Sequence, residues 1–197
     1  MNETKLNKVG AFQREIAYIR NPRYQENVKT LVALLPDYFF EIPASSTGKY
    51  HPDYALGEGG LLRHVKAAVR IARELLENPI SGAKFTNDEK DLIIIALIMH
   101  DGLKSGLVKQ KYTQVDHPLL VSNYIKENKD KLNFTDNELL ALTNMIESHM
   151  GIWNKDFNGN EVLPLPVNRY QKFVHMCDFL ASRKCIELKF ENNEIVY

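Results

Sequence analysis

Residues 92–101 read LIIIALIMHD, and this stretch decides the fold. Thr86 and Glu89 form a capping box before it, in which two side chains satisfy the first backbone N–H groups of a helix. A helix that is apolar on nearly all sides is buried. This one ends on His100 and Asp101. Because a buried, ionised Asp costs several kcal/mol unless it is paired or bound to a cation, the stretch predicts a polar centre inside a helical core.

The rest of the chain divides into further helices. Apolar residues at 61–76 follow the i, i+3, i+4, i+7 spacing of an amphipathic helix. A second capping box opens at Thr135, and Asp116 is expected to cap a helix with Pro118 in its first turn. The predicted fold is an all-α helical bundle with a short C-terminal β-hairpin. Its other helices are expected at 24–35, 135–149 and 167–186, and the hairpin at 187–197.

Length and composition limit the class of protein. The 197 residues include 25 Lys+Arg and 25 Asp+Glu, and 44% are apolar. That fits one compact domain, with 1–35 as a helical lead, 36–186 as the main unit and 187–197 as an extension. The balanced charge argues against attachment to duplex nucleic acid. An eight-residue longest apolar run, no visible export signal and only two cysteines predict a soluble cytoplasmic protein without a membrane partner. Whether it forms an oligomer is left open.

The histidines and two acids suggest a metal centre. Four of the six histidines fall at or near predicted helix ends, and Asp178, like Asp101, has apolar neighbours. One such histidine alone is ordinarily a cap or a core residue. The same pattern on five separate helices instead favours convergence around a divalent metal, which satisfies buried carboxylates and imidazoles together. The four histidines are His64, His100, His117 and His149.

These residues and their flanks resemble a known family. His64, His100-Asp101 and Asp178 are similar to the H…HD…D pattern of the HD-domain metal-dependent phosphohydrolases, an all-α superfamily. Residues 59–64 (GGLLRH) and 178–183 (DFLASR) are similar to its flanking motifs. Residues 38–44 (YFFEIPA) and Tyr50-His51 resemble the HD domain of the OB-fold-plus-HD 3′-5′ exoribonucleases. The resemblance covers about 36–186.

Three departures from the family pattern stand out. Residues 100–104 read HDGLK where the family has HDLGK, and His149 is followed by Met150 where two-metal relatives often have a second His. Only a short helical lead precedes residue 36, so the OB-fold is expected to be missing. That expectation weakens the case for RNA as substrate, since the OB-fold supplies a stacking platform for single strands.

The resemblance implies a two-metal centre. It assigns His64, His100, Asp101 and Asp178 to one metal ion, with Asp101 bridging to a second ion. Imidazole and carboxylate ligands without thiolate suit divalent transition metals, with Mn²⁺ or Fe²⁺ favoured and Ni²⁺, Co²⁺ or Zn²⁺ also fitting. The second ion would be held by His117 and His149 as well.

The implied activity is hydrolysis of a nucleotide-type phosphate ester by a metal-activated hydroxide. The expected substrate is a small nucleotide or a short oligonucleotide. Lys104, beside Asp101, is expected to face a phosphate, and His51, in the Gly/Pro-rich segment 37–60, to protonate a leaving group or touch substrate. The expected catalytic residues are therefore Asp101, Lys104 and His51, and the expected substrate-binding residues are Lys104, Lys109 and Lys111.

Competing interpretations remain. Some HD-fold proteins with four His and two Asp ligands are di-iron oxygenases, and a non-catalytic nucleotide-binding module is a third class. The complete ligand set argues against the third. A solvated loop is the ordinary explanation for Lys109 and Lys111, and a structural ion pair for Arg183. Phe39, Phe40 and Trp153 are read as core lids more readily than as base-stacking residues.

Overall fold

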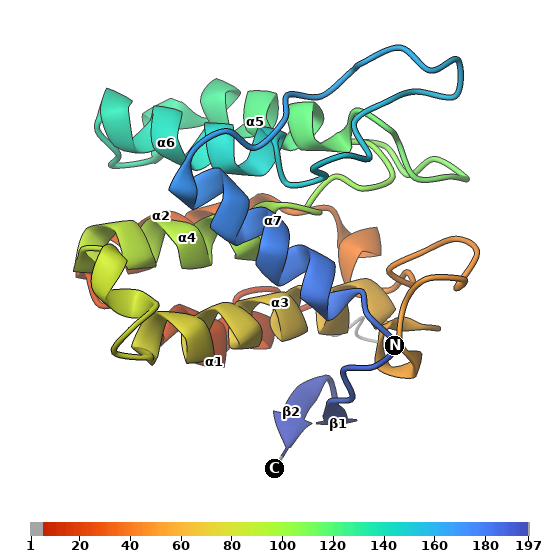
Figure 1. Ribbon diagram of the computed structural model, residues 1–197, viewed down its shortest axis with the longest axis horizontal. Helices are drawn as coiled ribbons and strands as arrows, with labels where there is room; N and C mark the ends of the chain where they lie inside the picture. Colours follow the sequence, from red (N-terminus) through yellow and green to blue (C-terminus); the bar gives the residue numbers. More distant parts are fainter. Residues whose placement is uncertain (1–5, 197) are drawn as a thin grey trace.

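The computed structural model describes residues 6–196 and is a helical bundle (Figure 1). The helices form layers, with α5 and α6 above, α2 and α4 in the middle, and α1 and α3 below; α7 crosses in front of them. The predicted all-α bundle with a short C-terminal hairpin is confirmed. The helices are α1 (Gln13–Ile16), α2 (Pro22–Leu34), α3 (Gly60–Glu77), α4 (Asn87–Met99), α5 (His117–Glu127), α6 (Asp136–Glu147) and α7 (Arg169–Ala181); the strands are β1 (Lys189–Glu191) and β2 (Glu194–Val196).

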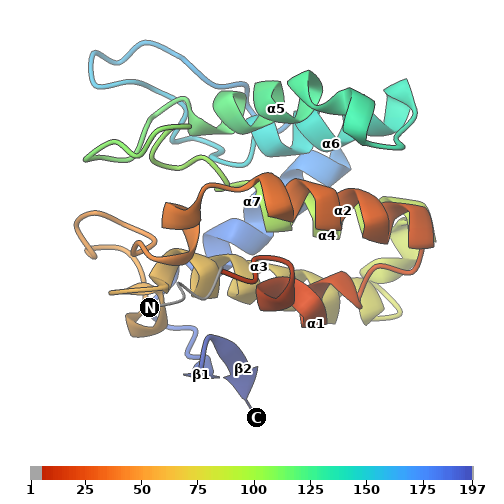
Figure 2. The same cartoon turned by 180° about the vertical axis from the view of Figure 1, so that it is seen from behind.

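Helix α4 is the centre of the bundle. It packs against α2, α3, α6 and α7, so every side of its apolar stretch is covered. Figure 2 shows α2 lying over α4 from behind. The Thr86 hydroxyl accepts from the Glu89 N–H and the Glu89 carboxylate accepts from the Thr86 N–H, as predicted for the capping box. All residues from Asp91 to Asp101 are buried, so the helix carries its last two polar residues into the interior.

Helix α3 begins against the preceding loop. The Ile42 carbonyl accepts from the Leu61 N–H, and a Cβ on Gly60 would lie 2.3 Å from the Ala55 carbonyl oxygen. Only glycine therefore permits the helix to start this close to the turn. The loop itself contains two short 3₁₀ turns, Asp37–Phe40 and Asp53–Ala55, whose residues Phe39 and Phe40 are buried in the core.

Several helix ends differ from the predictions. The Asp116 side chain makes no capping hydrogen bond; only its carbonyl accepts, from Leu119 and Leu120. Helix α6 stops at Glu147, two residues before His149. Helix α7 starts after an Asn168 cap and stops at Ala181 instead of residue 186; the Ser182 hydroxyl donates to the Phe179 carbonyl in its last turn.

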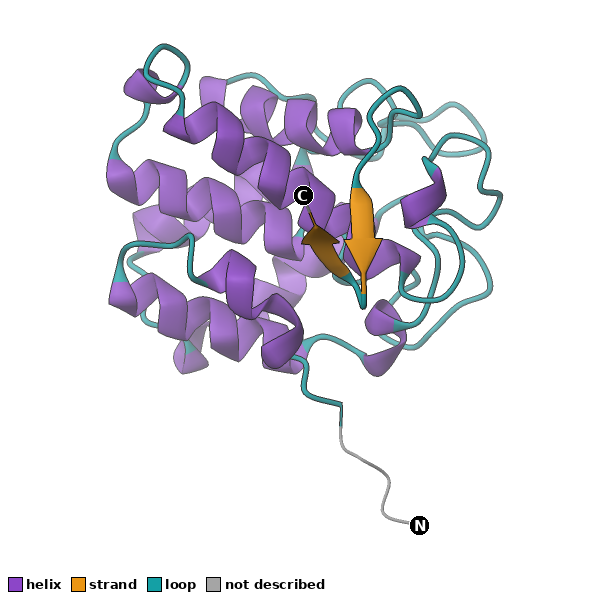
Figure 3. Cartoon of the chain, turned by 90° about the horizontal axis from the view of Figure 1, so that it is seen from below, coloured by secondary structure: helices purple, strands orange, loops and turns teal. Residues whose placement is uncertain are grey.

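The C-terminal hairpin docks on the bundle (Figure 3). Asn192 and Asn193 form its turn with φ values of 48° and 64°, a left-handed conformation that asparagine tolerates. Arg14 donates to the Ile195 carbonyl at 2.6 Å, and Arg63 donates to the Asn193 side chain at 2.6 Å. The hairpin therefore closes over the start of α3. Among the described residues, no helix is long and apolar enough to cross a membrane.

Candidate metal centre

The six predicted ligands converge at one place, although they come from five helices. His64 lies in the second turn of α3, His100 and Asp101 directly follow α4, and Asp178 lies in the last turns of α7. His117 begins α5 and His149 follows α6. These helix segments meet on the right-hand side of Figure 1. The two long loops that follow α4 and α6 also lie on this side, so the cluster is covered by loop segments.

Asp101 lies at the middle of the cluster, with each carboxylate oxygen facing a different pair of histidines. Oδ1 lies 2.9 Å from His117 Nε2 and 3.7 Å from His149 Nε2. Oδ2 lies 3.7 Å from His64 Nε2 and 3.6 Å from His100 Nε2. A carboxylate arranged in this way can bridge two metal ions.

Asp178 closes the other side. Its Oδ1 lies 2.9 Å from His64 Nε2 and 3.4 Å from His100 Nε2. His64, His100, His117, His149 and Asp101 are all buried, and Asp178 is partly exposed. The cluster therefore reaches solvent at its Asp178 side.

Backbone hydrogen bonds fix which ring nitrogen carries the proton in three of the histidines. The Nδ1 atoms of His100, His117 and His149 lie 2.7, 2.7 and 2.8 Å from carbonyl oxygens three residues earlier. A carbonyl only accepts, so each Nδ1 is the donor and each neutral ring presents an Nε2 lone pair. Those Nε2 atoms face carboxylate oxygens, which are also acceptors.

This arrangement is unfavourable without a cation between the acceptors. The buried atoms His100 Nε2, His117 Nε2 and Asp101 Oδ1 have no hydrogen-bond partner among the described residues. An unpaired buried polar group costs about 1–3 kcal/mol. A divalent metal satisfies the lone pairs together, and the hydrogen bonds at Nδ1 hold the rings as they do in known histidine–metal sites. The residues present therefore fit a metal ion.

Three sets of ligand atoms each lie within 4.8 Å of one another. Two of these sets each contain only ligands predicted for a single ion. The third set, His100, His149 and Asp178, combines ligands predicted for different ions. The donors are nitrogen and oxygen only, a combination suited to divalent transition metals. The other two sets are His64, His100 and Asp101, and Asp101, His117 and His149.

The electrostatics favour positive charge at the centre. Burial alone would raise the pKa of Asp101, but the neighbouring Lys104 and His100 hold it well below its usual range. The pKa of Asp178 is also held well below its usual range, because His100 and His64 outweigh its burial. Burial would lower the pKa of His100, yet the two carboxylates raise it. Burial and the nearby His100 lower the pKa of His149 to about 3.

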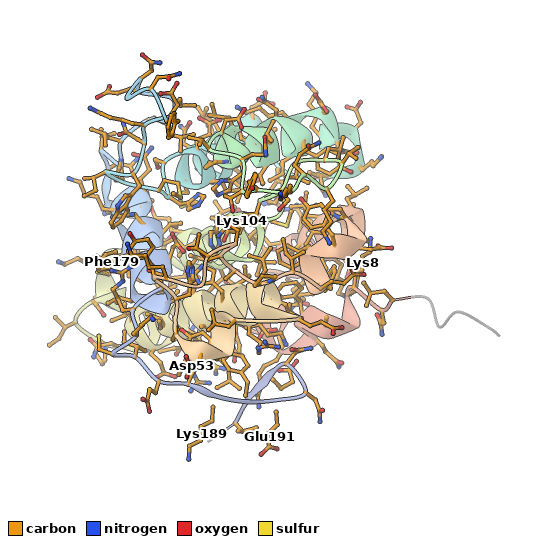
Figure 4. The ribbon with its side chains drawn as sticks, turned by 90° about the vertical axis from the view of Figure 1, so that its right-hand side faces the viewer. Lys8, Asp53, Lys104, Phe179, Lys189 and Glu191 are labelled. Carbon is orange, nitrogen blue, oxygen red and sulfur yellow. The ribbon has the colours of Figure 1, made fainter. Side chains whose placement is uncertain are left out.

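A cavity of about 450 Å³ opens over the cluster. Lys104 lines it and donates to Asp101 Oδ2 at 2.5 Å. In Figure 4, which looks onto the loop side, Lys104 and Phe179 appear on the same face. Lys109 and Lys111 are exposed and do not line this cavity, so their role in substrate binding stays a prediction. The lining residues are Tyr50, His51, Asp101, Lys104, His149, Met150, Trp153, Asp178, Phe179, Ser182 and Arg183.

Two further histidines support the centre. The ring of His51 lies 5.0 Å from the ring of His64, and its buried Nδ1 has no hydrogen-bond partner among the described residues. Burial and the nearby His64 lower the pKa of His51 to about 3. His175 Nδ1 donates to the His149 carbonyl at 2.7 Å. It packs there because Gly151 has φ +60° and no Cβ, which would lie 2.3 Å from the His175 ring.

Several residues around the site were not found from the sequence. The Tyr38 hydroxyl donates to the Gly106 carbonyl at 2.5 Å and accepts from the Ser105 N–H, which fixes the turn after Asp101. Arg183 was expected in an ion pair; instead its guanidinium lies 4.3 Å from the centre of the Phe179 ring and lines the cavity. Its position, one turn plus one residue after Asp178, did not predict this contact with the Phe179 ring.

Comparison with known proteins identifies relatives, two of which bear the same name. The chain is 29% identical over 174 residues to the 3′-5′ exoribonuclease YhaM of Shouchella clausii, covering 84% of this chain and 49% of the relative. It is 25% identical over 193 residues to the protein of that name from Listeria welshimeri, covering 92% and 56%. The chain thus spans about half the length of these curated relatives, and the predicted resemblance is confirmed. No protein-family model matches. No solved structure matches.

Proposed function

We propose that this protein is a metal-dependent phosphodiesterase that hydrolyses a nucleotide-type substrate, with short single-stranded RNA or oligonucleotide as the first candidate. Its main support is the set of imidazole lone pairs that face the Asp101 carboxylate beneath an open cavity. The printed names of the two relatives, both 3′-5′ exoribonucleases, support the choice of substrate.

The ligands proposed for the metal are the six converging side chains. Asp101 is proposed as the bridge, since its two oxygens face different histidine pairs. A divalent ion bound there supplies a Lewis acid that lowers the pKa of water and stabilises charge on phosphoryl oxygens. The chain's own contribution is to hold the ligands in place from the backbone, through the three Nδ1 hydrogen bonds. The proposed ligands are His64, His100, Asp101, His117, His149 and Asp178.

Lys104 and His51 are proposed to contact the substrate. Lys104 Nζ lies at the cavity wall on Asp101 Oδ2, where a phosphate at the centre would come within its reach. His51 lines the same cavity with an unpartnered buried Nδ1, which a substrate or water oxygen could satisfy. Lys109 and Lys111 lie outside the cavity, so they can contact only a longer substrate. Their replacement should then weaken activity on oligonucleotides and leave activity on mononucleotides unchanged.

A panel of substrates and metals tests the proposal. Purified protein is incubated with dinucleotides, short single-stranded RNA and DNA, cyclic nucleotides and dNTPs in the presence of Mn²⁺, Fe²⁺, Co²⁺, Ni²⁺, Zn²⁺ or Mg²⁺. We expect release of nucleoside monophosphate from the oligonucleotides with a transition metal. Asp101→Asn should lower kcat/KM by at least about 100-fold, since a bridging ligand is lost. Asp130→Asn, an exposed acid outside the site, is the control.

Other outcomes would replace the proposal. Oxygen uptake with Fe²⁺ and no hydrolysis would indicate a di-iron oxygenase. Tight nucleotide binding without turnover under any metal would indicate a non-catalytic binding module. If the protein holds less than about one equivalent of metal and His100→Ala behaves like wild type, the metal centre itself is refuted.

A further inference from the structure

Aromatic side chains line the mouth of the cavity rather than the core. Trp153 is 49% exposed, and its ring stacks on Phe179 with ring centres 5.8 Å apart and an angle of 14° between the planes. Tyr50, also exposed, lines the same cavity from the loop before α3. About half of the indole surface stays in water at the cavity, which leaves it available to a ligand.

Arg183 extends this aromatic pair. Its guanidinium carbon lies 4.3 Å from the Phe179 ring centre, within the range of a cation–π interaction. Its Nε donates to the Phe179 carbonyl and its Nη2 to the Ser182 hydroxyl, so the group is held in place. Its Nη1 has no hydrogen-bond partner among residues 6–196. A fixed, partly unpaired cation on an aromatic face is suited to a phosphate or to a base edge.

We infer that Trp153, Phe179 and Arg183 form a stacking site for the unpaired terminal base of a single-stranded nucleic acid. This inference rests on the proposed function and names the part of the substrate that the cavity recognises. Phe179 directly follows the proposed ligand Asp178, so a base on this surface lies beside a phosphate at the centre. Stacking on a flat aromatic face is available to every base, which makes the site tolerant of sequence.

The cavity's size and chemistry sharpen the inference. At about 450 Å³ it is near the lower end of the range for small-ligand pockets, and we expect it to hold one nucleotide at a time. Ser182 is already engaged by the Phe179 carbonyl and by Arg183, so beside the stacked rings Arg183 Nη1 is the group left to read a base edge. Stacking strength should therefore set the preference. A base held in a duplex must first unpair and unstack, so paired ends should be poor substrates.

Fluorescence reports the contact directly, because Trp153 is the only tryptophan in the chain. The metal-loaded protein is titrated with a single-stranded oligonucleotide whose last linkage is a non-hydrolysable phosphonate. We expect quenching of Trp153 when the 3′-terminal nucleotide is adenosine, and at least fivefold weaker binding when that nucleotide is abasic. Phe157→Ala, which removes a fully exposed aromatic from the same loop outside the cavity, should change neither result.

A substitution cycle measures the stacking contribution. Binding of a fluorophore-labelled oligonucleotide is followed by anisotropy for wild type, Trp153→Ala and Trp153→Phe, each with the adenosine and the abasic end. Trp153→Ala should weaken binding of the adenosine end about 5- to 150-fold, which corresponds to the usual stacking contribution per base. It should leave the abasic end unchanged, and Trp153→Phe should restore most of the affinity. Unchanged metal content and melting temperature confirm that the variants fold.

The two proposals fail in different ways. If wild type hydrolyses oligonucleotides but the abasic end costs the same in Trp153→Ala as in wild type, the stacking site is refuted and the phosphodiesterase stands. If no substrate is hydrolysed while the quenching and the abasic effect persist, the phosphodiesterase is refuted and the stacking site stands.

Discussion

The two ends of α4 each carry a buried aspartate, and the two are treated in opposite ways. Asp91 is 2% exposed and Asp101 is 1% exposed. Asp91 accepts from the Arg20 N–H at 3.0 and 3.1 Å and from the Asn21 N–H at 2.8 Å. Asp101 faces imidazole lone pairs and one lysine. The first carboxylate is satisfied by backbone N–H groups and joins α4 to the start of α2. The second has Lys104 as a donor and otherwise faces imidazole nitrogens, whose lone pairs a cation can satisfy.

The comparison shows that burial alone does not tell whether an aspartate has a structural or a functional role. Both side chains lie in the same core, Asp91 within α4 and Asp101 just after its end, and water no longer solvates either carboxyl group. The hydrogen-bond partners of each carboxylate decide which role it has. A buried carboxylate with backbone N–H donors needs no ligand, whereas one that mainly faces imidazole nitrogens is suited to a bound cation, which is typical of functional sites.

The largest expected effect comes from removing each carboxylate in turn. Asp91→Ala leaves two backbone N–H groups without their acceptor and should lower the free energy of unfolding by about 2–5 kcal/mol. Asp101→Ala removes the partner of Lys104 but leaves no backbone N–H group unpaired, and should therefore cost less than Asp91→Ala. Urea denaturation in the presence of a chelator measures both. Equal losses in the two variants would mean that Asp101 is a structural residue like Asp91, and the contrast would fail.

The next effect is stabilisation by metal. At a free Mn²⁺ concentration about 100 times the Kd, binding should add about 2.7 kcal/mol to the stability of wild type. For a chain of this length that corresponds to a rise in Tm of roughly 5–10 °C. Asp101→Ala should lose this rise. Asp91→Ala, although less stable, should keep it, because Asp91 lies at the far end of α4 from the cluster. Loss of the rise in both variants would show that it does not depend on the cluster.

The sequence predicts the helices and the histidine–aspartate cluster better than it predicts the hydrogen bonds of Asp91. Periodicity and capping boxes locate α3, α4 and the start of α6, because these signals are local. The six converging side chains were predicted as a set, from the same pattern on five separate helices and from the family resemblance; one such histidine alone is ordinarily a cap or a core residue. Asp91 gave no such signal: in the first turns of α4, among other charged residues, it resembles a solvated acid until α2 packs on it.

The aromatic part of the cavity wall could not be placed from the sequence either, because it depends on tertiary packing. Trp153 and Tyr50 lie in segments without periodicity, and their position depends on how two loops settle over the cluster. Arg183 lies just beyond the end of α7, where it contacts the Phe179 ring and the Ser182 hydroxyl. Such contacts are tertiary or marginal, and local pattern carries little information about them. Trp153 was expected as a core lid; the structure gives it a half-exposed place at the cavity.

A third acid, Glu138, extends the contrast to a carboxylate that is satisfied but only partly buried, and it gives the smallest effect. Its two oxygens accept from Arg23 at 2.6 and 2.7 Å and from the Tyr24 hydroxyl at 2.6 Å. The Arg23 hydrogen bonds lower its pKa from 4.5 to about 2. Because the folded-state pKa lies below the unfolded value, the stabilisation is complete above about pH 4.5 and is lost as pH falls towards 2.

Glu138→Gln should therefore cost roughly 1 kcal/mol at pH 7, since a bidentate ion pair becomes a neutral contact while the cap at Thr135 is kept. The difference in free energy of unfolding between wild type and variant should shrink as pH falls from 5 to 3. Glu26→Gln, in an exposed pair with Lys29, is the control and should cost less than about 0.5 kcal/mol at every pH. A Glu138→Gln difference that stays constant with pH would place its origin in packing rather than charge, and a satisfied carboxylate would then stabilise this fold only when it is buried as deeply as Asp91.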